Sequence, residues 1–183
     1  PIPGTRTILP AMASLLHLYR KKQRLVIHVI RLYLPDGSNA DRCRRQMLDR
    51  GRPVVAPGTS GAGLAEELVR EGADPLDFEA LLAGRFQETA PNEYVVYKPR
   101  WGAFYQTELN DFLRQKQIST LVFCGCNFPN CPRASIYEAS ERDYRIVIAR
   151  DALSGLYPRG EQEMTGIGAA LMNTSQISEA VCA

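Results

Sequence analysis

Three of the five cysteines lie close together, in the segment LVFCGCNFPNCPR that begins at Leu121. Cysteine sulfur can attack a carbonyl carbon, bind a metal ion, or pack as a small apolar group. Pro132 directly follows Cys131, and proline favours the first position of a helix, so a helix is predicted to start here. The positive end of a helix and its unpaired amides stabilise a thiolate and a developing oxyanion. Cys131 is therefore a candidate nucleophile, with a purely structural role as the alternative.

The remaining patterns argue against metal and phosphate chemistry. Cys124 lies within an apolar run, where a free cysteine behaves as a small hydrophobe, so we expect it in the core. A structural zinc site needs four ligands, usually in pairs, and C-x-C-x4-C has no second pair. His17 falls on a predicted helix and His28 in a predicted strand, where each is expected to be buried or hydrogen-bonded. The segment APGTSGAG lacks the lysine of a phosphate-binding loop and is expected to form a tight turn that caps a helix.

Length and charge set the class of protein. The 183 residues, with 45% hydrophobic side chains, fit a single domain spanning residues 1–183. The net charge of +2 comes from well-mixed residues, which argues against a nucleic acid or a membrane as the partner. No apolar run approaches the roughly 20 residues that span a bilayer. An odd number of cysteines favours a reducing compartment. We therefore expect a soluble, cytoplasmic protein.

Apolar runs without polar alternation are interleaved with helical patterns, which predicts a mainly parallel sheet. The fold class is an open, doubly wound α/β sheet with helices on both faces, a Rossmann-like three-layer arrangement. The predicted strands are 24–34, 93–98, 119–126, 144–151 and 169–173. The predicted helices are 8–22, about 40–50, one after Thr59 or Ser60 that carries Glu66 to Leu68, 106–116, 131–143 and 160–168. Ligands of such sheets bind beyond the carboxyl ends of the strands, where Lys98, the cysteine segment and Asp151 are expected.

The segment from YVVYKPRWGAF to IARDALSG resembles the isochorismatase-like cysteine hydrolases. The resemblance rests on a lysine, an aromatic G-A-F stretch, an apolar strand, and a cysteine before a helix. It implies that Cys131 is the nucleophile and that Lys98 assists it. It also implies an oxyanion hole at the amides near Asn127 and at Cys131, with a cis peptide at Cys126–Asn127. By the same resemblance, the substrate pocket is lined by Trp101, Phe104 and Phe128, no cofactor is needed, and a homo-oligomer, dimer or larger, is expected.

The sequence also departs from that family's pattern. Phe128 and Pro129 replace the usual threonine and acidic residue before the cysteine, and Pro132 replaces a valine. The family begins with an apolar strand that ends in a catalytic aspartate, whereas this sequence enters the first helix directly. The run LVIHVI follows that helix and corresponds to the family's second strand, so His28 does not take the aspartate's place. We expect that residues before Pro1 supply the missing strand and aspartate.

The leading hypothesis is therefore a cysteine-dependent hydrolase that cleaves a small amide, ureido or related C–N bond through a thioester. Nicotinamidases use a histidine-rich metal site, and true isochorismatases need no cysteine nucleophile, so neither branch fits well. The alternative is a non-catalytic relative that serves as a binding or assembly protein. A redox pair of Cys126 and Cys131 lacks the usual C-x-x-C spacing.

Overall fold

The computed structural model describes residues 3–46 and 55–182. The second half of the chain forms a parallel three-stranded sheet in the order β4-β5-β6. Its elements follow one another as β4 (Thr120–Gly125), α5 (Cys131–Ser140), β5 (Arg145–Leu153), α6 (Pro158–Gly166), β6 (Ala170–Met172) and α7 (Thr174–Cys182). Each parallel pair needs a crossover, and the two helices α5 and α6 supply it.

The first half forms a second sheet in the order β1-β3-β2. Its elements are α1 (Thr5–Lys21), β1 (Val26–Ile30), β2 (Gln87–Ala90), β3 (Glu93–Tyr97) and α4 (Leu109–Gln115). β1 and β3 are parallel, whereas β2 and β3 form an antiparallel hairpin. Asn92 takes the left-handed conformation that this tight turn requires, with φ of 60°.

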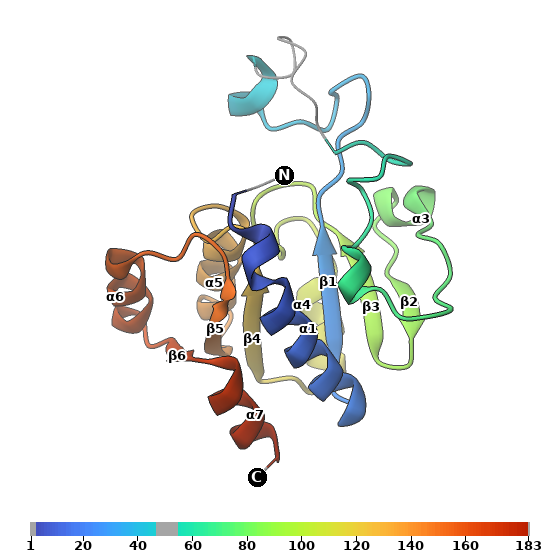
Figure 1. Cartoon of the computed structure of the whole chain (residues 1–183). Helices are drawn as coiled ribbons and strands as arrows, with labels where there is room; N and C mark the ends of the chain where they lie inside the picture. Colours follow the sequence, from blue (N-terminus) through green and yellow to red (C-terminus); the bar gives the residue numbers. More distant parts are fainter. Residues whose placement is uncertain (1–2, 47–54, 183) are drawn as a thin grey trace.

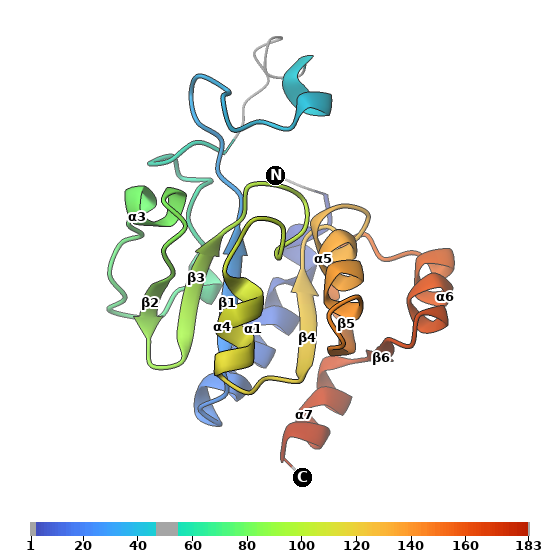
Figure 2. The same cartoon turned by 180° about the vertical axis from the view of Figure 1, so that it is seen from behind.

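Helices cover the strands from two sides. α1 lies on one face, and α4 and α5 lie on the opposite face, as the two views of Figures 1 and 2 show. Fully buried side chains such as Ile136, Ile148 and Met164 fill the layer between α5, α6 and the β4-β5-β6 sheet. The predicted open α/β fold with a mainly parallel sheet is confirmed. Within residues 3–46 and 55–182, no helix is long and apolar enough to cross a bilayer.

The segment between β1 and β2 differs most from the prediction. The helix expected after Thr59 is reduced to one 3-10 turn, η2 (Glu66–Leu68). Thr59 Oγ1 donates to the carbonyl of Ala56 at 2.7 Å, so it closes a local turn and caps no helix. The helix expected over 40–50 is represented by the 3-10 turn η1 (Arg42–Arg44), and its part from 47 onward lies outside the described residues.

Three further elements had no predicted counterpart: β2, α3 (Phe78–Leu82) and α7. β2 has the sequence QETA, which carries no apolar alternation, so its pairing with β3 has to specify it. α3 has only five residues, too few to show a helical period, and it depends on the Asp77 side chain, which accepts from the amide of Ala80.

β1 and β4 are each paired on one side only in the part of the chain that the structure describes. The strands β3 and β5 are deeply buried, whereas Val29 of β1 is 37% exposed and Cys124 of β4 is also exposed. The prediction that Cys124 is a core residue is therefore wrong for this structure. An apolar strand edge without a partner leaves its backbone groups and side chains open to water.

A buried carboxylate joins α1 to the β1-β3-β2 sheet. Glu93 begins β3 and is 3% exposed. Arg20 of α1 donates to it from Nε at 2.8 Å and Nη2 at 2.7 Å, and His28 Nε2 lies 2.8 Å from Oε1. Burial alone would raise the pKa of this carboxyl, but the hydrogen bonds and charges of Arg20 and His28 outweigh burial and lower it to about 2. The expectation that His28 is hydrogen-bonded is confirmed.

Replacing Glu93 by Gln should change how stability depends on pH. A carboxyl with a lowered pKa stabilises the fold above its ordinary value of 4.5 and loses that effect as the pH falls towards about 2. The wild type should therefore lose up to about 3 kcal/mol of unfolding free energy over this range through Glu93 alone. Urea unfolding between pH 2 and 7 should show a flatter acid limb for Glu93→Gln. The same substitution at exposed Glu67 is the control and should leave the limb unchanged.

Amide hydrogen exchange should reveal the unpaired edge of β4. Successive amides of a strand point to alternate sides, so every second amide of β4 donates to β5 and the others face the free edge. We expect slow and fast exchange to alternate along Thr120–Gly125, in contrast to uniformly slow exchange in the middle of β5. Uniform protection of β4 in NMR-detected exchange would contradict the free edge.

Candidate active site

Lys98 follows β3 directly and is 4% exposed. Its backbone amide donates to the carbonyl of Ile30, which holds it level with the end of β1. The ammonium Nζ donates to the carbonyls of Arg100 and Trp101, both at 2.7 Å. The chain therefore turns back over the lysine immediately after the strand, and the two carbonyls replace part of the water that the ammonium has lost.

Cys131 lies close enough to this ammonium to influence its pKa. Burial lowers the pKa of Lys98, and the nearby Cys131 opposes that shift by favouring the charged form. Arg31 lowers the pKa a little further, and Asp41 raises it. Lysine and cysteine, 33 positions apart in the sequence, thus form one electrostatic pair at the carboxyl ends of neighbouring segments.

Cys131 is the first residue of α5 and is half-buried. The helix begins at Cys131, as predicted, and Pro132 takes its second position rather than the first. Among the described residues, no carbonyl accepts a hydrogen bond from the amides of Asn127 or Cys131. The amides between them are used, since Phe128 donates to Ser154 at 2.7 Å and Asn130 to Asn127 at 3.0 Å. Two unpaired donors therefore lie on either side of the loop that leads to the cysteine.

The loop before Cys131 is fixed to the end of β5. The amide of Ser154 donates to the carbonyl of Gly125 at 3.0 Å, which complements the bond from Phe128 to Ser154. The peptide bond between Cys126 and Asn127 is cis. The side chain of Asn130 donates to Asn127 Oδ1 at 3.1 Å. Together these bonds fix the direction from which the chain enters α5.

Side chains of α5 fasten the loop that carries Lys98. Ser135 Oγ donates to the carbonyl of Cys131 at 2.8 Å and accepts from the amide of Ala103 at 3.0 Å. Glu138 accepts from the amide of Phe104 at 2.9 Å. A side chain at Gly102 would overlap the carboxylate of Glu138, so only glycine permits this approach. The helix of the cysteine and the loop of the lysine are thereby held together.

Sequence reasoning did not find Ser135 and Glu138. Cys131, Ser135 and Glu138 are spaced four and three residues apart, so they share one face of the helix. This spacing predicts a shared helix face, but the sequence does not show which loop packs against that face.

The aromatic residues predicted for the substrate pocket have different surroundings. Phe128 is fully buried and packs edge-on against Tyr157, with ring centroids 5.6 Å apart. Phe104 is 5% exposed and packs against Tyr144. Trp101 is half-buried and lies under the guanidinium of Arg44. Of the three, Trp101 is the one whose side chain retains substantial exposure.

The other two cysteines of the segment differ from Cys131. Cys126 is half-buried and precedes the cis bond. Cys124 is exposed as a residue because its strand edge is unpaired, but burial of its thiol, which interacts with Tyr19, raises the thiol pKa to about 11. A thiol with so high a pKa is protonated at neutral pH, which argues against a nucleophilic role.

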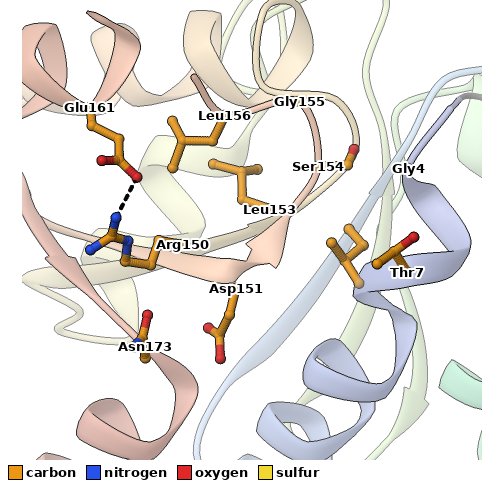
Figure 3. Close-up of a pocket in the computed structure, with 11 residues that line it drawn as sticks. Gly4, Thr7, Arg150, Asp151, Leu153, Ser154, Gly155, Leu156, Glu161 and Asn173 are labelled. Atoms are coloured by element: carbon orange, nitrogen blue, oxygen red, sulfur yellow. Dashed lines mark hydrogen bonds and ion pairs between the residues drawn. The ribbon is translucent and has the colours of Figure 1, made fainter. Parts of the chain in front are cut away.

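A pocket of about 440 Å³ lies elsewhere, between the start of α1 and the end of β5 (Figure 3). Its charged groups are already paired, since Arg150 bonds to Glu161 at 2.8 Å and Asp151 accepts from the hydroxyl of Thr174 at 2.8 Å. Neither Lys98 nor Cys131 lines it. Asp151, predicted at the strand end with them, thus belongs to a different place. Over residues 3–46 and 55–182, no three His, Cys, Asp or Glu side chains gather as metal ligands would.

Removing the Glu138 carboxylate should loosen the loop. Glu138→Ala leaves the amide of Phe104 without its acceptor, which should cost about 1–3 kcal/mol of unfolding free energy. Glu138→Gln keeps an acceptor and should recover most of that loss. Chemical unfolding measures both, with Glu141→Ala, an exposed carboxylate at the end of the same helix, as the control. Equal stability of Glu138→Ala and the control would contradict the fastening role.

Comparisons with known proteins identify the family of this chain. A family model of the isochorismatase domain matches residues 2–176. The "Probable inactive nicotinamidase" of Arabidopsis thaliana is 28% identical over 160 residues, which cover 86% of this chain and 72% of that protein. The ureidoacrylate amidohydrolase of Methylorubrum extorquens is 28% identical over 126 residues, 69% of this chain but only 43% of that protein.

A solved structure shows the same fold over the whole chain. The crystal structure of an isochorismatase family protein from Desulfovibrio vulgaris superposes with a TM-score of 0.81 and is 27% identical in sequence, covering 100% of this chain and 88% of that one. The family model spans nearly the whole chain, and a lysine–cysteine pair lies at the ends of the strands. This chain therefore belongs to the isochorismatase family.

Proposed function

We propose that the protein is a cysteine-dependent hydrolase that cleaves a small amide, ureido or related C–N bond through a thioester. The observation that carries the proposal is the pairing of Cys131, at the start of α5, with the buried ammonium of Lys98. A positive charge and a helix start both favour the thiolate, which is the nucleophilic form. The related ureidoacrylate amidohydrolase, by its name, acts on a ureido compound and supports this substrate class.

In the first step, the Cys131 thiolate attacks the carbonyl carbon and forms a C–S bond, and the carbonyl oxygen takes up the electron pair. The unpaired amides of Asn127 and Cys131 are the candidates for holding this oxyanion, because donors placed where charge develops lower the barrier. When the C–N bond breaks, the nitrogen leaves as an amine or ammonia after gaining a proton. Lys98, whose pKa Cys131 influences, is the candidate donor of that proton.

In the second step, water attacks the thioester, the acid is released, and the thiolate is restored. This step needs a base that takes a proton from the water. Among the described residues, no carboxylate is hydrogen-bonded to Cys131, so the base is not assigned. The resemblance to cysteine hydrolases implies an aspartate in this role.

The pairing of Lys98 and Cys131 should be visible as reactivity. Iodoacetamide should label Cys131 faster at pH 7 than it labels exposed Cys182, which serves as the internal reference. Lys98→Gln keeps a hydrogen-bond donor for the two carbonyls but removes the charge, and should slow labelling of Cys131 about tenfold, equivalent to about 1.4 kcal/mol. The rate at Cys182 should not change. Peptide-resolved mass spectrometry measures both rates.

Measuring turnover should then distinguish a hydrolase from a non-catalytic protein of the same fold. Ammonia release from a panel of small amides and ureido compounds should disappear in Cys131→Ser. A reactive Cys131 without turnover of any compound would instead favour a non-catalytic protein of the same fold. The relative whose name describes it as inactive makes that alternative worth testing.

A further inference from the structure

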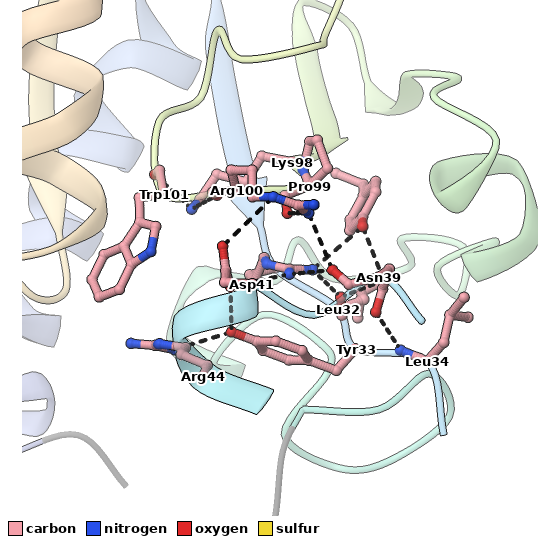
Figure 4. A network of polar contacts seen from close by, with 12 residues as sticks. Leu32, Tyr33, Leu34, Asn39, Asp41, Arg44, Lys98, Pro99, Arg100 and Trp101 are labelled. Carbon is pink, nitrogen blue, oxygen red and sulfur yellow. Dashed lines mark hydrogen bonds and ion pairs between the residues drawn. The ribbon is translucent and has the colours of Figure 1, made fainter. Parts of the chain in front are cut away.

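Next to the nucleophile, the structure gathers more positive charge than it neutralises. Arg31, Arg44, Lys98 and Arg100 come together around a single carboxylate, Asp41, in the network of Figure 4. Arg44 joins this network by donating to the hydroxyl of Tyr33, which also contacts Asp41. Among residues 3–46 and 55–182, four cations against one carboxylate leave a net positive charge here even when Cys131 is a thiolate.

The inner members of this network are structural. The Arg31 side chain is only 13% exposed and donates to the carbonyl of Asn39 at 2.8 Å and to Tyr97 Oη at 3.3 Å. It also lies 3.5 Å from Asp41, whose side chain is 7% exposed. A buried guanidinium needs a carboxylate close by, and Asp41 meets that need for Arg31. Asp41 therefore mainly balances the charge of Arg31.

The outer members, Arg44 and Arg100, are less committed. Arg100 is 39% exposed, and its Nε is 3.8 Å from Asp41, beyond hydrogen-bond distance, while Nη1 donates to the carbonyls of Pro99 and Asn39. Arg44 stacks 4.3 Å above the ring of Trp101 and donates from Nη1 to Tyr33. In the described part of the chain, Nη2 of each has no hydrogen-bond partner, so both guanidinium groups keep donors available.

These arginines adjoin the lysine–cysteine pair. The carbonyls of Arg100 and Trp101 accept the hydrogen bonds of Lys98 Nζ, so the backbone that carries Arg100 touches the charged partner of Cys131. Trp101 in turn supports Arg44. A guanidinium held over an aromatic ring can still donate from its remaining N–H groups to a planar anion.

We propose that Arg44 and Arg100 bind a carboxylate of the substrate, and that the protein therefore prefers small acids whose carboxylate lies near the scissile amide or ureido carbonyl. This inference rests on the proposed function of Cys131. A guanidinium binds a carboxylate through two parallel, charge-assisted hydrogen bonds. Arg44 and Arg100 are specificity residues in this arrangement, and Asp41 with Arg31 positions them.

A pair of alkylating reagents tests this without turnover. Iodoacetate and iodoacetamide both transfer a carbon to the thiolate with loss of iodide, but only iodoacetate carries a carboxylate. Both reagents react with the thiolate, so the ratio of their rates at Cys131 does not depend on the fraction of Cys131 that is deprotonated. We expect Arg44→Gln and Arg100→Gln each to lower the iodoacetate-to-iodoacetamide ratio about tenfold, as expected when a charge-assisted hydrogen bond is lost.

Arg42→Gln is the matched control. Arg42 lies in the same 3-10 turn as Arg44 and is exposed, so its replacement changes the net charge equally without touching the network. Its ratio should match the wild type. Arg44→Lys keeps the charge but not the planar fork, and its ratio should fall between those of wild type and Arg44→Gln. Equal ratios in wild type, Arg44→Gln and Arg100→Gln would overturn the inference, as would an equal fall in Arg42→Gln. Thermal unfolding of each variant separates misfolding from a change in the site.

A binding measurement keeps the inference testable if Cys131 reacts with neither reagent, a result that would sink the proposed function itself. N-carbamoylglycine and its neutral amide are titrated into the Cys131→Ser protein by calorimetry. The acid should bind at least tenfold more tightly than the amide, and Arg44→Gln should remove that preference. Equal affinity for the two compounds would overturn the carboxylate site.

Discussion

The buried ammonium of Lys98 is the constraint on which the site depends. An ammonium that leaves water loses several kcal/mol of solvation unless polar groups replace the water. Here two backbone carbonyls that follow within three residues replace part of that water, and the nearby Cys131 favours the charged form of the lysine. Because the carbonyls belong to the loop after β3 and Cys131 to α5, the charge is compensated only when loop and helix are both in place.

The contacts of α5 provide that placement. Ser135 bridges the carbonyl of Cys131 and the amide of Ala103, and Glu138 holds the amide of Phe104. The helix thus presents its first residue to the lysine and its next turns to the lysine's loop. This close contact between helix and loop requires glycine at position 102, since any Cβ there would displace the carboxylate of Glu138. The same loop then carries Arg100 and Trp101 outward to the arginine network (Figure 4).

The two half-sheets distribute these parts. Lys98 follows β3, the central strand of one sheet, and the loop to Cys131 leaves β4, an edge strand of the other, so the candidate site draws on both sheets. Among the described residues, β1 and β4 are each paired on one side only. The pocket of Figure 3, in contrast, is formed by the start of α1 and the end of β5, and Lys98 and Cys131 do not line it.

The sequence by itself determined the alternation of strands and helices, because unbroken apolar runs and helical periods are local patterns. It also placed Lys98 and Cys131 at the ends of their strands, since each directly follows or closely follows such a run. The sequence did not predict β2, because its polar residues form a strand only through pairing with β3. Nor did it predict the exposure of Cys124, which depends on whether a neighbouring strand is present. The tertiary structure alone decided that Ser135 and Glu138 face the lysine's loop and that Arg44 reaches Trp101. Those contacts join residues 32 to 57 positions apart, and no local pattern encodes which distant surfaces meet.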